Sequence, residues 1–298
     1  GGGGGGEAGG GGGGARVPKL TSPTGTPLPA RPHVVLNRGD IRNKMLIVGD
    51  IHGCLDETKL LLQKAGYDPA TMDLISVGDL VNKGPYSAEC IRFLRETDAT
   101  VVRGNHDDAV LQAALRVGRF AEAPPPAKYD YVSELTDEDI RWYGNIPLSV
   151  RIPHLSPPIL IVHAGVVPGV ELESQRFEDL VTMRQLLVGD KPSEWRSLVR
   201  PQSDAEYWAR VFSRESSAGE AEATVLPDSS EAVHIFFGHD AKKGLQQETR
   251  ATGLDTGCCY GKSLTAALVH VHEDDTWHSE LLSVPALREY SAPGHKKK

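Results

Sequence analysis

The chain repeats one pattern: a short apolar run rich in Val, Ile and Leu is followed at once by Gly, Asp, Asn or His. Because successive positions in these runs are apolar, they predict strands that are buried on both faces. The segments after the first three runs carry apolar residues at helical spacing, which predicts helices over 55–65, 87–95 and 108–117. The five runs are residues 45–48, 74–77, 101–102, 159–162 and 233–237.

Strands that alternate with helices predict an α/β fold, in which a ligand site lies at the carboxyl ends of the strands. A fourth helix is expected over 137–142, where Thr136 would be the N-cap and Asp139 would complete a capping box. Residues 171–232 lack this rhythm and mix Arg, Trp and Ser with acidic residues. We expect them to form a lid or an insertion.

The two ends of the chain differ in composition from the rest. Residues 1–14 are almost all glycine, and five prolines follow between residues 18 and 32. Such a segment has high backbone entropy and few side chains to bury. We therefore expect a disordered leader over 1–32, one domain over 33–290 and a basic tail over 291–298, which would either contact an anionic partner or be solvated.

Composition and charge exclude several classes of protein. With 298 residues, 39% of them hydrophobic, the chain can build one sizeable core, so collagen, coiled-coil and wholly disordered chains are excluded. The net charge of −8 argues against binding of bulk nucleic acid or an anionic membrane. Four scattered cysteines do not make a disulfide scaffold, and no apolar run is long enough to span a membrane. The default expectation is a cytoplasmic protein.

Candidate chemistry follows the predicted strands. Each strand ends in a residue type that binds metals, and the geometry of strand ends would gather these side chains at one edge of the sheet. A single example would more often be a capping Asp or a loop His, but five strand ends together predict a metal site. The residues are Asp50, His52, Asp79, Asn105, His106, His163 and His239.

These motifs resemble the five motifs of the calcineurin-like metallophosphoesterases, in their PPP-type branch, and the resemblance covers residues 45 to about 270. The second motif and the segment 253–266 are similar to those of the ApaH group, which comprises the bacterial symmetrical diadenosine tetraphosphatases and eukaryotic ApaH-like relatives. The motifs are Gly49-Asp50-Ile51-His52-Gly53, Gly78-Asp79-Leu80-Val81-Asn82-Lys83-Gly84-Pro85, Gly104-Asn105-His106-Asp107, His163-Ala164-Gly165 and Gly238-His239.

The resemblance implies a sandwich of two mixed sheets flanked by helices, with a binuclear metal centre. Asp50, His52 and Asp79 would hold one ion. Asp79 would bridge to a second ion, held also by Asn105, His163 and His239. Oxygen and nitrogen ligands suit Mn, Fe or Zn equally. A bridging carboxylate fits two ions about 3.5 to 4 Å apart, a spacing that clamps a phosphoryl group and acidifies a bridging water, which would attack phosphorus as hydroxide.

His106 is implied as the general acid that protonates the leaving group. In the protein phosphatases of this branch an Asp supports that histidine, whereas this chain has Asn82. An Asn can accept the imidazole N–H but lacks the charge that stabilises the imidazolium, so the proton would be held more weakly. This favours acidic leaving groups such as phosphate or a nucleotide, and therefore phosphoanhydride substrates. Alternatively, Asn82 is a tolerated loop residue without bearing on the substrate.

Three further residues are candidates for binding phosphate or substrate. Lys83 stands where protein phosphatases carry a phosphate-binding Arg, and a Lys offers a point charge instead of a planar fork. Arg184 lies where relatives bring a second such Arg, with a surface ion pair as the alternative. Tyr260 would line the pocket or serve packing alone.

The expected function is metal-dependent hydrolysis of a phosphoanhydride in a dinucleoside polyphosphate, an mRNA cap or inorganic polyphosphate. A protein Ser/Thr phosphatase is the first alternative, favoured if residues 171–232 open into a groove that admits a polypeptide. A second alternative is an inactive, metal-bound scaffold that recognises nucleotide or RNA ends. Phosphate release from these substrates and from a phosphopeptide distinguishes the three.

Overall fold

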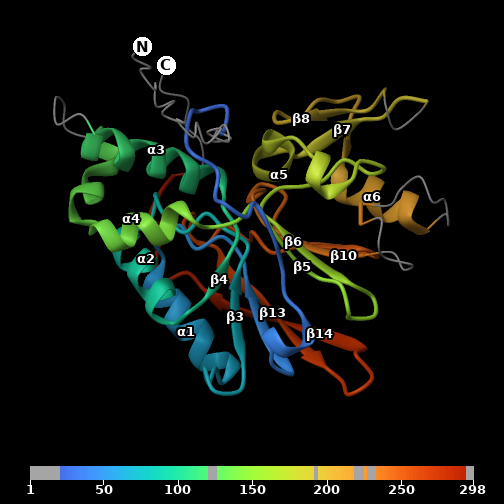
Figure 1. Cartoon of the computed structure of the whole chain (residues 1–298), viewed down its shortest axis with the longest axis horizontal. Coiled ribbons are helices and arrows are strands. Elements are labelled where there is room, and N and C mark those ends of the chain that lie inside the picture. Colours follow the sequence, from blue (N-terminus) through green and yellow to red (C-terminus); the bar gives the residue numbers. More distant parts are fainter. Residues whose placement is uncertain (1–20, 120–125, 191–193, 218–224, 227–232, 293–298) are drawn as a thin grey trace, which may run out of the picture.

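Two large β-sheets pack face to face, and helices and a small third sheet cover their outer faces (Figure 1). The computed structural model describes residues 21–119, 126–190, 194–217, 225–226 and 233–292. Apolar side chains of both large sheets meet between them, among them Ile47, Ile75, Ile161 and Phe236. Each large sheet contains both parallel and antiparallel pairs. The expected sandwich of two mixed sheets flanked by helices is confirmed.

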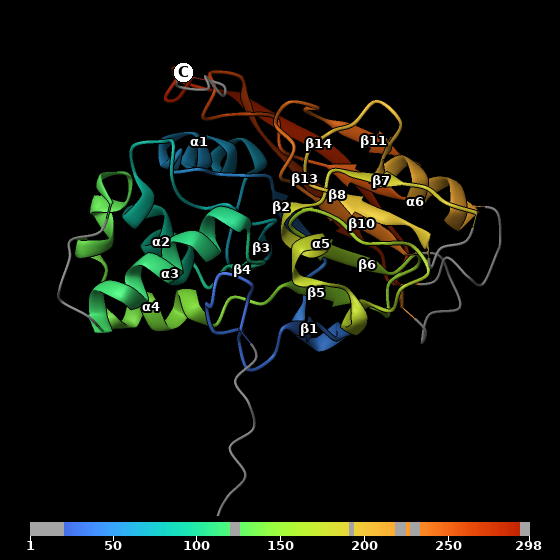
Figure 2. The same ribbon diagram turned by 90° about the horizontal axis from the view of Figure 1, so that it is seen from above.

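The five-stranded sheet has the order β14-β13-β2-β3-β4. Its strands β2, β3 and β4 run parallel, so their carboxyl ends meet at one edge, while β13 pairs antiparallel with both β2 and β14. Four helices, α1 to α4, lie together on the outer side of this sheet (Figure 2). The strands are β2 (Lys44–Val48), β3 (Asp73–Ser76), β4 (Thr100–Val101), β13 (Ser263–Val271) and β14 (Trp277–Pro285).

The six-stranded sheet has the order β1-β5-β6-β10-β12-β11. At its centre β6, β10 and β12 run parallel, so that the loops after β6 and β10 leave the same edge. Its strands are β1 (His33–Val35), β5 (Ser149–Ile152), β6 (Ile159–Val162), β10 (His234–Phe237), β11 (Gln246–Glu248) and β12 (Ala251–Gly253).

The helices on the five-stranded sheet follow the spacing of apolar residues closely. The first begins and ends at the predicted residues, and Gly66 ends it in the left-handed conformation at φ 62°. The predicted capping box is present, because Thr136 and Asp139 each accept the other's backbone N–H, at 3.1 and 2.9 Å. The helices are α1 (Leu55–Ala65), α2 (Ser87–Glu96), α3 (Asn105–Arg119) and α4 (Asp137–Gly144), with 3-10 helices η1 (Arg38–Asp40) and η2 (Ala127–Glu134).

One helix begins earlier than the sequence predicts. The apolar spacing places its start at Asp108, whereas α3 begins at Asn105. The first turn therefore contains Asp107 and Asp108, whose negative charge suits the positive end of the helix dipole. Consequently Asn105 and His106 project from a helical turn and not from the loop before it.

The described part of residues 171–232 covers the outer face of the six-stranded sheet. Its apolar side chains, such as Leu186, Trp208 and Phe212, pack with Val162 and Phe237 of that sheet. A small sheet of order β8-β7-β9 lies here, between two helices. The elements are η3 (Leu172–Ser174), α5 (Phe177–Thr182), β7 (Gln185–Leu187), β8 (Arg196–Leu198), β9 (Glu206–Tyr207) and α6 (Trp208–Ser217). No described helix is long and apolar enough to cross a membrane.

Part of the expected leader packs on the domain. Ser22 and Thr24 donate hydrogen bonds to the Asp108 carboxylate, at 3.1 and 2.6 Å, and the carbonyl of Pro27 accepts one from Arg103 at 3.2 Å. The buried pair of Arg103 and Asp108 needs such partners, which the Ser/Thr/Pro segment supplies. The expectation that residues 21–32 are disordered is therefore wrong, while residues 1–20 and the end of the basic tail lie outside the described residues.

Candidate metal centre and active site

The strand ends of both sheets bring the predicted metal ligands to one buried place around Asp79. Its Oδ2 lies 3.5 Å from Nε2 of His52, and its Oδ1 lies 3.5 Å from Nε2 of His163. One candidate group contains His52, Asp79 and His106, and a second contains Asp79, His163 and His239, with all ligand atoms of a group within 4.8 Å of one another. Asp79 belongs to both groups, which is the position expected of a bridging carboxylate.

Hydrogen bonds fix which nitrogen of each imidazole carries its proton. Nδ1 of His52 donates to the carbonyl of Val81 at 2.8 Å, and Nδ1 of His163 donates to that of Val77 at 2.9 Å. Both rings therefore turn the lone pair of Nε2 toward Asp79. His239 donates from Nε2 to Thr182 at 3.0 Å, which leaves Nδ1 as its lone-pair atom. Neutral imidazoles oriented in this way are suited to bind metal ions.

Asn105 adds an observation that favours a cation. Its Oδ1 lies 3.2 Å from Nε2 of His163. Because Nδ1 of that ring donates to a carbonyl, neither facing atom has a proton to share. A cation between them removes the repulsion of two lone pairs. The residues present thus fit a metal ion at this point.

Asp50 faces the same cluster and a second carboxylate. It is buried, its two oxygens accept the backbone N–H of His239 at 3.1 Å, and its Oδ2 lies 3.9 Å from Nε2 of His52. Burial raises the pKa of Asp50, and the neighbouring carboxylates of Asp255 and Asp79 raise it further. Burial also raises the pKa of Asp255. The sequence assigned no role to Asp255, although it lies within the quoted ApaH-like segment.

The charges around Asp79 are set by burial and by its neighbours. Burial opposes ionisation of Asp79, but His163, His106, His52 and the ammonium of Lys83 together hold its pKa below the usual range. Burial lowers the pKa of His52 to about 3. Asp79 is therefore ionised and His52 is neutral, which are the protonation states that these residues need as metal ligands.

The ligand residues adopt a backbone conformation that side chains rarely take. His52, Asp79 and His239 have φ values of 45°, 51° and 72°. Each such residue costs roughly 1–3 kcal/mol and persists only where its surroundings hold it. At Gly104 a Cβ atom would collide with the Asp79 carboxylate, so only glycine fits there. The local backbone is thus shaped to place these side chains.

Asp107, to which the sequence pattern assigned no role, organises the loops that carry the ligands. Its carboxylate accepts the backbone N–H groups of Asp79 at 2.8 Å, Leu80 at 2.9 Å and Gly104 at 2.8 Å, and the hydroxyl of Tyr143 at 2.7 Å. Burial raises its pKa to about 6, while the hydrogen bonds from Gly104 and Tyr143 act in the opposite sense. A signal was present, because Asp107 belongs to the motif that follows β4.

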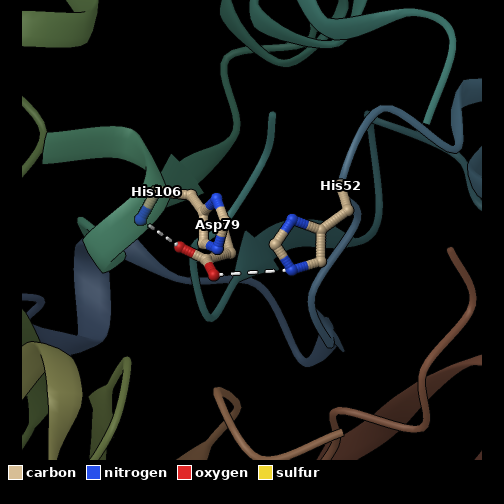
Figure 3. A group of neighbouring side chains, drawn as sticks. All are labelled: His52, Asp79 and His106. Atoms are coloured by element: carbon tan, nitrogen blue, oxygen red, sulfur yellow. Dashed lines mark hydrogen bonds and ion pairs between the residues drawn. The ribbon is translucent and has the colours of Figure 1, made fainter. Parts of the chain in front are cut away.

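His106 lies beside the cluster with its backbone N–H 2.9 Å from Oδ1 of Asp79 (Figure 3). Its Nδ1 is 3.1 Å from Nδ2 of Asn82, whose Oδ1 accepts a hydrogen bond from Tyr131 at 2.6 Å. The expectation that the amide oxygen of Asn82 accepts the imidazole N–H is therefore wrong. The amide nitrogen of Asn82 faces His106, so Asn82 donates to Nδ1, and the proton of the neutral ring lies on Nε2.

A cavity of about 400 Å³ opens at this cluster and is lined by Asp79, Asn105, His106 and His239. The three residues expected to bind phosphate or substrate also line it: Lys83, Arg184 and Tyr260. Lys83 Nζ lies 2.7 Å from Nε2 of His52 and 5.2 Å from the ring centre of Tyr260. Arg184 donates to the carbonyls of Val199 at 3.0 Å and of His239 at 3.3 Å.

Comparison with known proteins gives concordant results. Two curated relatives are symmetrical bis(5'-nucleosyl)-tetraphosphatases. The one from Aromatoleum aromaticum is 31% identical over 74% of this chain and 91% of its own length. The one from Thioalkalivibrio sulfidiphilus is 30% identical over 78% and 97%.

Two solved structures extend the comparison. A protein assigned as a diadenosine tetraphosphatase superposes with a TM-score of 0.66 at 27% identity, covering 86% of this chain and 98% of that one. A protein serine/threonine phosphatase from Saccharomyces cerevisiae shares the fold, with a TM-score of 0.51 at 16% identity over 85% of this chain and 84% of its own. Residues 44–243 match the model of the calcineurin-like phosphoesterases. The chain therefore belongs to the calcineurin-like phosphoesterase family, as its five motifs predict.

Proposed function

We propose that this chain hydrolyses a phosphoanhydride bond of a dinucleoside polyphosphate at the centre around Asp79. The observation that carries the proposal is the position of the Asp79 carboxylate, with a lone pair of His52 facing one oxygen and a lone pair of His163 facing the other. The curated relatives named as symmetrical tetraphosphatases support the substrate class and favour it over a phosphoprotein.

Two metal ions, whose number and identity stay part of the proposal, fit these residues. Asp50, His52 and Asp79 would hold one, and Asp79, Asn105, His163 and His239 would hold the other. When bound, the ions would supply positive charge that offsets the charge of the phosphates and makes a water molecule more nucleophilic. Mn, Fe and Zn all accept such ligands. Metal content per chain, measured on wild type and Asp79→Asn, tests this, and both ions should be weakened in the variant.

His106 would act as a general acid in its imidazolium form, which can give the Nε2 proton to the oxygen of the departing phosphate or nucleotide and become a neutral ring. Because Asn82 donates to Nδ1, the imidazolium is disfavoured, and burial lowers the pKa of His106 in the same sense. A neutral imidazole gives up its proton far less readily than an imidazolium. The leaving group must therefore depart with little help, as a phosphate does, since its second pKa is about 6. A serine alkoxide needs the proton much more.

The test compares kcat/KM for diadenosine tetraphosphate, capped RNA, inorganic polyphosphate and a phosphoserine peptide. Wild type should prefer the dinucleoside polyphosphate. His106→Ala should lower the rate on the phosphopeptide far more than on the anhydride, because general acid catalysis contributes about 10²–10⁴ only where a proton is needed. Asn82→Asp should improve phosphopeptide cleavage and leave anhydride cleavage nearly unchanged. The proposal would be overturned if wild type had a higher kcat/KM for the phosphopeptide than for diadenosine tetraphosphate, or the same kcat/KM for both.

A further inference from the structure

The cavity continues beyond the candidate metal ligands to a rim that carries more positive charge. Besides Lys83 and Arg184, it is lined by Arg200, Lys242 and Lys262. We propose that Arg200 and Lys242, with Lys262, bind the distal phosphates of the substrate, the half of the polyphosphate chain that leads away from the attacked phosphorus. This inference rests on the proposed function and assigns residues to the part of the substrate that lies beyond the attacked phosphorus.

Two of these cations are free to bind a ligand. Within the described part of the chain, Arg200 and Lys242 form neither an ion pair nor a hydrogen bond, and both are exposed. The cations deeper in the cavity differ in this respect, since Lys83 contacts His52 and Arg184 lies 3.6 Å from the Asp240 carboxylate. A chain of net charge −8 thus exposes unpaired positive charge at the mouth of the cavity. Such charge attracts anions at short range.

The rim is held in place by contacts to the centre. Arg184 joins the segment 199–201 to the loop after β10, because it donates to the carbonyls of both Val199 and His239. Nζ of Lys262 donates to the carbonyl of Ala241 at 3.2 Å, directly before Lys242. The backbone positions of Arg200 and Lys242 are therefore fixed relative to the candidate metal ligands. A phosphate chain that starts at the centre meets the rim without rearrangement of the backbone.

The size of the cavity and its charge favour several phosphates over one. A volume of about 400 Å³ is far larger than one phosphoryl group and falls in the range of roughly 300–1,000 Å³ found for sites of drug-sized ligands. Five cationic side chains line it against three carboxylates, Asp79, Asp240 and Asp255. Arg184 lies beside Asp240, so the balance at the rim is positive. A single phosphate bound at the candidate metal ligands would not contact the cations of the rim.

The same rim offers an apolar surface for a nucleoside. Val199 is 46% exposed although it is a large apolar side chain, and Pro201 and Tyr207 line the cavity with it. Nζ of Lys243 lies 4.2 Å from the ring centre of Tyr207, which steadies the ring. Bases stack on such aromatic and apolar surfaces. This favours a chain that ends in a nucleoside over inorganic polyphosphate.

The test compares one variant with a matched control. Arg200→Gln/Lys242→Gln removes two charges at the rim. The control Lys59→Gln/Lys44→Gln removes two charges from exposed lysines that do not line the cavity. The readouts are KM for diadenosine tetraphosphate and the inhibition constant of inorganic orthophosphate, which probes the centre alone. In the rim variant KM should rise about 3- to 30-fold more than the inhibition constant, because each exposed ion pair contributes a factor of a few. In the control the ratio should stay at its wild-type value.

The outcomes separate this inference from the proposed function. If wild type does not cleave the tetraphosphate, the proposed function fails, and the rim is then judged by equilibrium binding of the tetraphosphate to both variants. If wild type cleaves it but the rim variant and the control behave alike, the rim does not bind distal phosphates, and only this inference falls. Tyr207→Ala should weaken the binding of diadenosine tetraphosphate more than the binding of inorganic tetraphosphate. An equal loss of affinity for both molecules would overturn the proposal that this surface binds the nucleoside.

Discussion

Replacing Asp107 by Asn should loosen the candidate metal centre without touching any candidate ligand. Oδ2 of Asp107 accepts the N–H groups of Asp79 and Gly104, while Oδ1 accepts that of Leu80 and the hydroxyl of Tyr143. In the variant the amide oxygen should remain at the Oδ2 position, where two backbone donors need it. The new amide nitrogen would then face Leu80 and Tyr143.

The magnitude follows from these four bonds. The tyrosine hydroxyl can rotate and accept from the amide, but the N–H of Leu80 cannot, and a buried donor without an acceptor costs about 1–3 kcal/mol. The remaining bonds lose their charge assistance, which brings the expected loss to roughly 2–4 kcal/mol. At roughly 2–4 °C per kcal/mol for a large domain, Tm should fall by about 4–16 °C.

The assay is Tm by calorimetry together with metal content per chain after dialysis. Metal content should fall with Tm, because the backbone N–H of Asp79 and that of Gly104 both bond to this carboxylate. Tyr143→Phe is the matched control, since it removes one donor and leaves all three backbone bonds, at a cost of about 1 kcal/mol. A variant Asp107→Asn with the Tm of this control and the metal content of wild type would refute the reasoning.

Three further variants test other parts of the structure. Arg103→Ala should destabilise the chain by about 3–5 kcal/mol in denaturant titration, because it leaves the buried charge of Asp108 unpaired; a loss below 1 kcal/mol would contradict this. Deletion of residues 1–32 should lower Tm relative to deletion of residues 1–20, since only the longer deletion removes partners of Asp108; equal Tm values would show that these contacts contribute nothing. Gly104→Ala should lower kcat and metal content, measured by steady-state kinetics and metal analysis, because its Cβ would displace the Asp79 carboxylate; full activity would exclude the tight fit.

The part of the fold that follows from local patterns is predictable from the sequence. The apolar spacing places α1 at its observed bounds, and Thr136 with Asp139 marks the start of α4. The strand ends predict which side chains gather, because parallel strands share an edge. In the structure Asp79 lies between two sets of imidazoles, as expected for side chains that follow neighbouring strand ends.

Other features depend on contacts between residues far apart in the sequence. The role of Asp107 arises from backbone donors in the loops after β3 and β4 and from Tyr143, and no local pattern reveals them. Asn82 points its amide nitrogen at His106 while its oxygen accepts a hydrogen bond from Tyr131, which is distant in the sequence. The segment around Ser22 looks disordered by composition, yet Asp108 binds it. In each case a polar group contacts a partner that is distant in the sequence.

The small sheet β8-β7-β9 separates the residues that form the cavity wall from the residues that would bind metal. Residues 199–201 and Tyr207, in or beside that sheet, form a wall of the cavity, whereas the candidate metal ligands all follow strands of the two large sheets. Mutations or insertions in this sheet and in residues 199–201 can therefore change which substrates enter the cavity without changing the candidate metal ligands. Related proteins with the same metal ligands can therefore differ in substrate specificity through this segment. Exchange of the segment between two such proteins should transfer the specificity.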